Sequence, residues 1–352
     1  MKRLVIDRNA VVQNFRAVKS RAKSMEIIED LTADAYGMGI LETAKTLKRE
    51  GVMSFAISDP KDAQKLRSAG FTNERLMMLR STADSDELSE LIDLNVICAV
   101  GSYDAAVAIN GIAESRKTVC EVQIKIDTGL GRYGFLPTEM DKVASIYRYM
   151  SNLAVVGVFS TYAESWRSEK YTKRQYETFE SALKSITSMG FEYCSAHIMD
   201  SAALFRYDFG MFDAVRVGTA LSGRVAGKNV AGLTRVGYIE ASVEETGWFP
   251  KGHRVGSTVL KRPTRLAVLS VGNYNGVGIT RRDYERSIFD AIRAYNLRPR
   301  VRIGEQRVKI VGEIGLTHTI VDVKNADCKV GDVAVIDVDP INVKGLTTTY
   351  IN

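Results

Sequence analysis

The sequence alternates short strand-like runs with amphipathic helical segments up to about residue 220. A repeated β-then-α pattern implies right-handed crossovers and a parallel sheet. Eight such units within about 250 residues match a closed β/α barrel, so we predict an eight-stranded β/α (TIM) barrel. A doubly wound open sheet is the alternative, and the count of eight disfavours it. The expected strands are Glu26–Leu31, Met53–Ser58, Arg75–Arg80, Val96–Val100, Val119–Asp127, Ala154–Thr161, Tyr193–His197 and Ala214–Val217.

The pattern changes near residue 225, where strand-like runs begin to follow one another directly. A single helical segment, Asp283–Tyr295, lies between two of them. A chain of 352 residues is long enough for two cores. We therefore expect a barrel over residues 1–225 and a C-terminal, mostly β domain over 226–352. Its expected strands are Arg235–Val243, Thr258–Val259, Leu266–Val271, Val308–Val311, Thr319–Val323 and Val333–Val338.

Composition argues against a membrane, a nucleic acid or a metal as partner. The apolar runs are far shorter than the ~20 residues of a membrane span, and Asp7 interrupts any signal-like stretch. Four scattered cysteines without a CxxC pair, and only 3 histidines, favour reduced thiols in a cytoplasmic protein without a metal site. The net charge is +6, but acidic residues interrupt the most basic stretch, Arg281–Lys309, which favours a solvated surface over a nucleic-acid site.

Polar residues gather where the expected barrel strands end, which is the functional face of such a barrel. Two glycine-bearing turns follow the seventh and eighth strands, with Ser201 opening a helix and Gly218-Thr219 after the last strand. Backbone N–H groups at such turns commonly bind phosphate. Ser201 as a plain helix cap is the alternative.

Several segments at these strand ends resemble alanine racemase, a fold-type III racemase that depends on pyridoxal phosphate. They are Ala33-Asp34-Ala35-Tyr36-Gly37, the run Lys125–Phe135 with the sequence KIDTGLGRYGF, Phe212–Gly218, His197–Ala202 and, more loosely, Ser270–Gly276. The resemblance covers essentially the whole chain in order. It implies a barrel followed by a β domain, and a head-to-tail homodimer. It also implies that a lysine after the first barrel strand binds the cofactor covalently, while a tyrosine from the partner acts on the opposite substrate face.

The chain departs from this pattern at its reacting centre. Thr32 stands where the cofactor lysine belongs, and Ser257 where the tyrosine belongs. Thr161 takes the place of a supporting histidine, and Gly315–Thr317 replaces an element that contacts the substrate carboxylate. Threonine cannot form a Schiff base, so we expect no covalent cofactor, no catalytic residue at the family positions and no alanine racemase activity.

The rest of the family's pocket is retained. The resemblance places a phosphate at Tyr36, Ser201, Gly218 and Thr219, and a pyridine nitrogen at Arg216. Lys125 and Arg132 fall where the family has a carbamylated lysine and the arginine that it orients; with His197 they form the expected substrate pocket.

We interpret the chain as a pseudoenzyme that binds a small phosphate-bearing ligand, with noncovalent pyridoxal phosphate as one candidate. One alternative is an enzyme that uses Lys125, Arg132 or His197 for other chemistry on an amino-acid-like substrate. Another is a subunit that pairs with an active racemase.

Overall fold

The computed structural model describes residues 1–225, 232–279 and 299–352. Within them the chain divides into two compact units. One is Val12–Leu233, and the other combines Met1–Val11 with Thr234–Asn352.

The first unit contains a nearly closed barrel of eight parallel strands, as the alternating sequence pattern predicted. The strand order is β8-β7-β6-β5-β4-β3-β2-β9, and an isolated bridge between Met199 and Val215 links the chain after β8 to β9. The strands are β2 (Glu26–Asp30), β3 (Ser54–Ile57), β4 (Arg75–Ser81), β5 (Val96–Val100), β6 (Cys120–Lys125), β7 (Leu153–Phe159), β8 (Ser195–His197) and β9 (Ala214–Val217).

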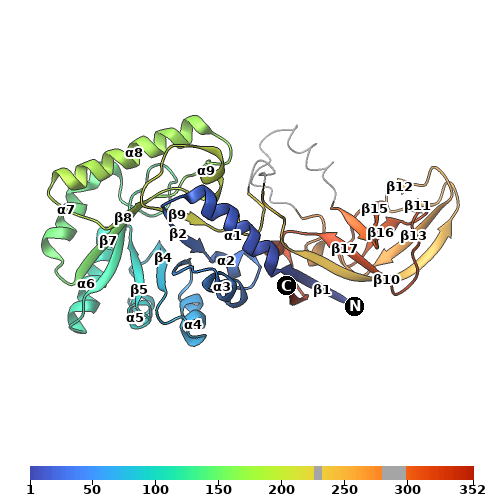
Figure 1. Ribbon diagram of the computed structural model, residues 1–352, viewed down its shortest axis with the longest axis horizontal. Coiled ribbons are helices and arrows are strands. Elements are labelled where there is room, and N and C mark those ends of the chain that lie inside the picture. Colours follow the sequence, from blue (N-terminus) through green and yellow to red (C-terminus); the bar gives the residue numbers. More distant parts are fainter. Residues whose placement is uncertain (226–231, 280–298) are drawn as a thin grey trace. The chain divides into compact units, whose positions relative to one another are not determined.

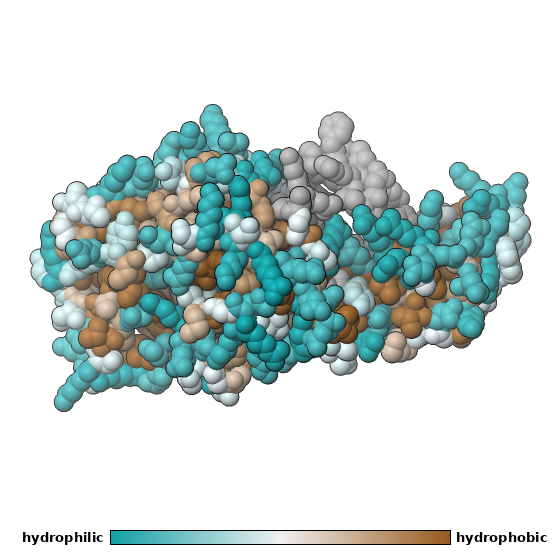
Figure 2. Space-filling model, viewed as in Figure 1, coloured by the Kyte–Doolittle hydropathy of each residue, from teal (hydrophilic) through white to brown (hydrophobic). Residues whose placement is uncertain are grey.

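Helices lie on the outside of these strands (Figure 1). Several begin at residues whose side chains accept a backbone N–H of the first turn: Asp59 before α4, Asp84 before α5, Ser102 before α6 and Ser168 before α8. Figure 2 shows polar side chains over most of the visible face, with hydrophobic ones in patches between them. The helices are α1 (Arg8–Ala22), α2 (Thr32–Tyr36), α3 (Ile40–Arg49), α4 (Pro60–Ser68), α5 (Ser85–Asp93), α6 (Tyr103–Ser115), α7 (Met140–Tyr149), α8 (Glu169–Ser188) and α9 (Ser201–Arg206).

The barrel interior changes from apolar to polar along the strands. One buried cluster contains Met77, Ile97, Ala99 and Phe159, and Leu79 packs against it. Side chains alternate between the two faces of a strand, so Gln123 and Lys125 share one face of β6 while Val122 and Ile124 take the other. All four are buried. The polar pair lies toward the carboxyl end of the strand, where function is expected in a barrel.

The second unit is an antiparallel β domain, except that β1 (Lys2–Asp7) runs parallel to β18 (Thr347–Ile351). Its strand order is β13-β16-β15-β14-β17-β10-β1-β18, and an additional β10–β13 pairing closes the sheet on itself. The other strands are β10 (Tyr238–Phe249), β11 (Arg254–Val255), β12 (Thr258–Val259), β13 (Thr264–Leu269), β14 (Val301–Ile303), β15 (Gln306–Ile310), β16 (Thr319–Asp322) and β17 (Val333–Asp337). The expected helical segment Asp283–Tyr295 lies outside the described residues.

The N-terminal strand differs from the sequence prediction, which included it in a barrel domain of residues 1–225. Lys2 to Val5 pair with β10, and Arg3 to Asp7 pair with β18. Leu4, Val5 and Ile6 are buried in this sheet. Partners more than 200 residues away decide where β1 folds, and the local pattern carries no sign of them.

Candidate functional site

A left-handed turn follows the first barrel strand. Ala33, Asp34, Ala35 and Tyr36 have φ angles of 54°, 57°, 53° and 55°, and Gly37 continues at 79°. For residues other than glycine this conformation costs about 1–2 kcal/mol each. The Ala35 N–H donates to Leu31 O at 2.8 Å, which helps to hold the turn. Backbone strain of this kind is concentrated at functional sites.

Thr32 is the first residue of α2 and is partly buried. Its backbone N–H donates to Asp30 Oδ1 at 2.9 Å, so the preceding strand fixes its position. Its side chain offers a hydroxyl and no amine. The residue therefore does not fit a carbonyl cofactor bound as a Schiff base at this point.

Tyr36, Ser201 and Gly218, three of the residues that the sequence analysis expected at a phosphate site, lie close together. A Cβ atom on Gly218 would lie 2.7 Å from both Cζ and the hydroxyl oxygen of Tyr36, so only glycine fits there. Ser201 Oγ accepts the N–H groups of Gly218 at 3.1 Å and Ala220 at 3.2 Å. We call Tyr36, Ser201, Gly218, Thr219 and Ala220 the phosphate cup.

Two hydrogen-bond donors of the phosphate cup remain available to a ligand. Because Ser201 Oγ accepts two N–H groups, its own hydroxyl hydrogen is left to donate. The Thr219 N–H has no hydrogen-bond acceptor within the described residues. Both donors suit a phosphate oxygen. Tyr36 Oη, in contrast, donates to Asp30 Oδ2 at 3.0 Å, which places a carboxylate beside the cup. The cup thus fits a phosphate group, with Asp30 as an opposing charge.

Arg216, on β9, is buried and held by neighbouring strands. Its guanidinium donates to Ser160 O at 2.5 Å, to Thr161 Oγ1 at 3.0 Å and, through Nη1, to His197 Nδ1. Burial lowers the pKa of Arg216 to about 10, so it stays charged near neutral pH. Thr161 thus helps to anchor this arginine.

His197 is fully buried at the end of β8, and both of its ring nitrogens are engaged. Its Nε2 lies 2.7 Å from Gln123 Oε1. Arginine can only donate, so His197 Nδ1 must be the acceptor and Nε2 must carry the proton. Burial and the Arg216 charge hold the pKa of His197 well below its ordinary 6.5. The neutral ring orients Arg216.

Two glutamines that contact these residues, Gln123 and Gln175, were not predicted from the sequence. Gln123 lies two residues before Lys125 on the same strand face, a spacing that could have revealed it. Gln175, on α8, donates through Nε2 to Thr128 Oγ1 at 3.1 Å and to Thr161 O at 3.2 Å. No local pattern marks Gln175, because it lies on the buried face of an otherwise ordinary amphipathic helix.

Lys125 ends β6 with a side chain inside the barrel. The residue is only 3% exposed, and its Nζ donates to Leu79 O in a long hydrogen bond of 3.4 Å. The Phe159 and Tyr133 ring centroids each lie 5.3 Å from Nζ. Burial, followed by the charges of Arg216 and Arg132, lowers the pKa of Lys125 from 10.5 to about 8.

The loop after β6 is organised by Asp127. Its carboxylate accepts the N–H groups of Gly129, Leu130 and Gly131 at 2.9–3.1 Å. Arg132 is exposed on this loop, and its Cζ lies 5.9 Å from the Tyr133 centroid. Lys125 and Arg132 therefore approach the same aromatic ring.

Ser257 belongs to the other unit, in the turn between β11 and β12. It is exposed, and its hydroxyl donates to Glu313 Oε1 at 2.8 Å. Thr317 is hydrogen-bonded to His318 Nδ1 at 2.9 Å.

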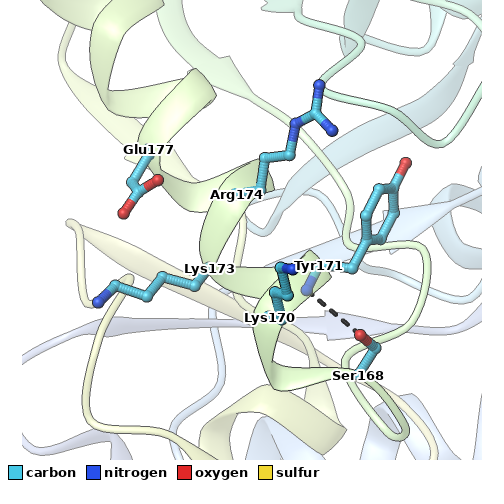
Figure 3. A pocket seen from close by; sticks show the side chains of 6 residues that line it. All are labelled: Ser168, Lys170, Tyr171, Lys173, Arg174 and Glu177. Carbon is cyan, nitrogen blue, oxygen red and sulfur yellow. Dashed lines mark hydrogen bonds between the residues drawn. The ribbon is translucent and has the colours of Figure 1, made fainter.

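A surface hollow of about 460 Å³ lies at the start of α8, where no site was predicted. Six residues line it: Ser168, Lys170, Tyr171, Lys173, Arg174 and Glu177. In Figure 3 its basic side chains point in different directions, so they do not converge on one ligand. Tyr171 instead holds the Asp127 loop, because its hydroxyl donates to Gly129 O at 2.7 Å.

Neither a metal site nor a membrane span stands out in the described ranges. No three His, Cys, Asp or Glu side chains gather there closely enough to bind a metal ion. Over the same residues, no helix combines the length and the apolarity that crossing a membrane requires.

Comparison with known proteins gives one consistent result. Residues 6–225 match the family described as "Alanine racemase, N-terminal domain". The chain is similar to alanine racemase of Carboxydothermus hydrogenoformans, with 31% identity over 271 residues, 75% of this chain and 73% of that protein. It is 28% identical to alanine racemase of Clostridium tetani over 342 residues, 94% of this chain and 84% of that protein. Alanine racemase from Streptomyces lavendulae has the same fold, with a TM-score of 0.85 at 23% identity, covering 100% of this chain and 97% of that one.

Proposed function

Because this chain belongs to the alanine racemase family, we propose that it is a member without racemase activity that binds a small phosphate-bearing ligand noncovalently. The observation that carries the proposal is the contrast between Thr32 and the phosphate cup. Thr32 offers no amine at the position of the cofactor lysine, while the Ser201 hydroxyl and the Thr219 N–H remain available to an anion.

The chain's own residues support binding more than catalysis. The Ser201 hydroxyl and the Thr219 N–H would bind phosphate oxygens. Gly218 has no side chain, so the Tyr36 ring can lie directly against the backbone at this position. Arg216 presents a fixed positive charge that neutral His197 and Thr161 orient. Pyridoxal phosphate, if bound, would supply an electron-withdrawing ring and an aldehyde. Thr32 leaves that aldehyde without its usual lysine.

The test is to add pyridoxal phosphate or inorganic phosphate to the purified chain and then to dialyse. We expect saturable binding that dialysis reverses, competition between the two ligands, and no racemisation of alanine. Ser201→Ala should weaken binding of both ligands by about tenfold, because it removes the hydroxyl donor and the oxygen that holds the backbone at Gly218 and Ala220 in place. Measurable alanine racemase activity in the unmodified chain would refute the proposal.

We also propose that the chain forms a homodimer. The β unit exposes apolar side chains next to one another: Tyr274 is 54% exposed, Leu316 is 70% exposed, and the Tyr274 N–H donates to Leu316 O at 3.0 Å. An obligate dimer should bury over about 2,000 Å². Light scattering at micromolar concentration should give twice the chain mass, and a monomer would contradict this. A mixed dimer with an active racemase is the competing outcome, which native mass spectrometry after mixing would reveal.

A further inference from the structure

We propose that the ligand of the phosphate cup is a small phosphate ester that also carries a primary ammonium group. The phosphate binds at Ser201 and Thr219, and the ammonium group lies against Asp30 and the Tyr36 hydroxyl. This deepens the proposed function and rests on it, because it names a second charge that the same ligand must carry.

Asp30, the last residue of β2, places a carboxylate beside the cup. Its Oδ2 accepts the Tyr36 hydroxyl at 3.0 Å, and its Oδ1 accepts the Thr32 N–H at 2.9 Å. Both donors are neutral, and Asp30 forms no ion pair within the described residues. All three residues are partly exposed, so a ligand from solvent can reach the carboxylate. Thr32 has no charge of its own, which leaves the cationic partner to the ligand.

Arg216 does not serve as that partner. Its two terminal nitrogens donate to His197 Nδ1, Ser160 O and Thr161 Oγ1. Burial lowers the pKa of Arg216, and the charge of Asp30 opposes this effect without an ion pair forming between the two in the described ranges. The Asp30 carboxylate thus keeps its remaining lone pairs for a ligand.

Tyr36 and Asp30 together present hydrogen-bond acceptors. A tyrosine hydroxyl has one hydrogen, and here it is donated to Asp30 Oδ2, so its oxygen can only accept from a ligand. A carboxylate can accept about two hydrogen bonds at each oxygen. A phosphate oxygen is an acceptor as well, so this pair repels it. An ammonium group supplies both the N–H donors and the opposite charge.

The acceptor pair and the phosphate donors are neighbours. A Cβ atom on Gly218 would lie 2.7 Å from the Tyr36 hydroxyl oxygen, and the Gly218 N–H donates to Ser201 Oγ at 3.1 Å. Thr219, the other donor to the phosphate, directly follows Gly218. The cup therefore suits a ligand in which a short linker joins the phosphate to the ammonium group.

The test compares three phosphate esters that differ only at the far end of a two-carbon chain. Phosphoethanolamine has a primary ammonium group, 2-hydroxyethyl phosphate has a neutral hydroxyl, and phosphocholine has a positive charge without N–H donors. Isothermal titration of the full chain should show phosphoethanolamine binding at least about tenfold more tightly than the other two. Equal affinities for phosphoethanolamine and 2-hydroxyethyl phosphate would overturn the inference and leave phosphate binding intact.

Variants locate the preference for the amine. Asp30→Asn should reduce the ratio of the two affinities, phosphoethanolamine over 2-hydroxyethyl phosphate, to less than about twofold, because the negative charge is lost. Tyr36→Phe, which removes one acceptor, should reduce the ratio less. Asp59→Asn, at the cap of α4, should keep the wild-type ratio. An unchanged ratio in Asp30→Asn would mean that the amine binds elsewhere, which contradicts the proposal.

The same head group occurs free and on lipids, and vesicles of phosphatidylethanolamine distinguish the two sources. We expect the free ester to bind and the chain to stay in the supernatant when the vesicles are sedimented. Vesicle binding that phosphoethanolamine displaces would support the same recognition with a lipid as the ligand. If neither inorganic phosphate nor any of the three esters binds, the proposed function fails together with this inference.

Discussion

Asp30 is the residue in this site that most opposes anion binding. Its carboxylate accepts hydrogen bonds from the Tyr36 hydroxyl, which belongs to the phosphate cup, and from the Thr32 N–H. A negative charge here repels a phosphate through a medium that is less polar than water. Asp30 also contributes to keeping Arg216 charged, so its effect on the site is not limited to the phosphate cup.

We therefore expect Asp30→Asn to tighten phosphate binding by about tenfold, because the charge disappears while one side-chain oxygen can still accept a hydrogen bond. Isothermal titration with inorganic phosphate measures the change. Asp59→Asn is the matched control, since asparagine caps a helix as well as aspartate does and α4 lies outside the cup. Weaker binding by Asp30→Asn would mean that Asp30 supports the cup structurally.

The sequence predicted which residues lie near one another better than it predicted their hydrogen bonds, and their role in binding stays a prediction. Tyr36, Ser201 and Gly218 meet as expected, because each follows directly from a motif at a strand end. The contacts of His197 with Gln123 and Arg216 were not predicted. They join three different strands, and the protonation of His197 depends on which partner donates. No spacing within one segment encodes that choice.

At the scale of elements, strands and helices with a regular local pattern were predicted well. The strand Val96–Val100 was expected with the bounds that β5 has. The strands β1, β11, β14 and β18 were missed. β1 and β18 pair with each other across nearly the whole length of the chain, so no local pattern marks either of them. The left-handed turn at Ala33–Tyr36 was missed as well, since nothing in these residue types demands positive φ.

The position of β1 leads to a prediction about Ile6, which is 2% exposed and pairs with Tyr350 of β18. Ile6→Ala should cost about 2–5 kcal/mol of stability by leaving a cavity. Hydrogen exchange should show the loss in β10 and β18, while the barrel strands β3 to β6 keep their protection. Arg3→Ala, at a partly exposed position of the same strand, should have a smaller effect. Equal loss of protection in the barrel would show that the two units unfold together.

At the scale of the whole molecule, stability should depend on pH through a buried acid that the site does not use. Glu29 of β2 is fully buried, and within the described part of the chain both of its carboxyl oxygens lack a hydrogen-bond partner. Its register neighbours, Phe55 and Val217, are apolar. Burial, followed by the charge of Asp30, raises the pKa of Glu29 well above 4.5. The folded protein therefore holds a proton that the unfolded chain releases.

The sign of the effect follows from this difference. The folded state keeps its full advantage from Glu29 below pH 4.5, and loses it as the pH rises toward the raised pKa of the folded protein. The slope is at most about 1.4 kcal/mol per pH unit. His197 acts in the opposite sense below its ordinary pKa of 6.5, because its folded pKa is lowered. The loss due to Glu29 should therefore be clearest above pH 6.5, where the contribution of His197 no longer changes.

We expect Glu29→Gln, which cannot ionise, to become progressively more stable than the wild type between pH 6.5 and 8. Urea unfolding at several pH values in this range measures the difference in the free energy of unfolding. Glu114→Gln, at an exposed position on α6, should follow the wild-type curve. If Glu29→Gln runs parallel to the wild type across the range, Glu29 must be ionised in the folded protein, and a cation or solvent must reach it there.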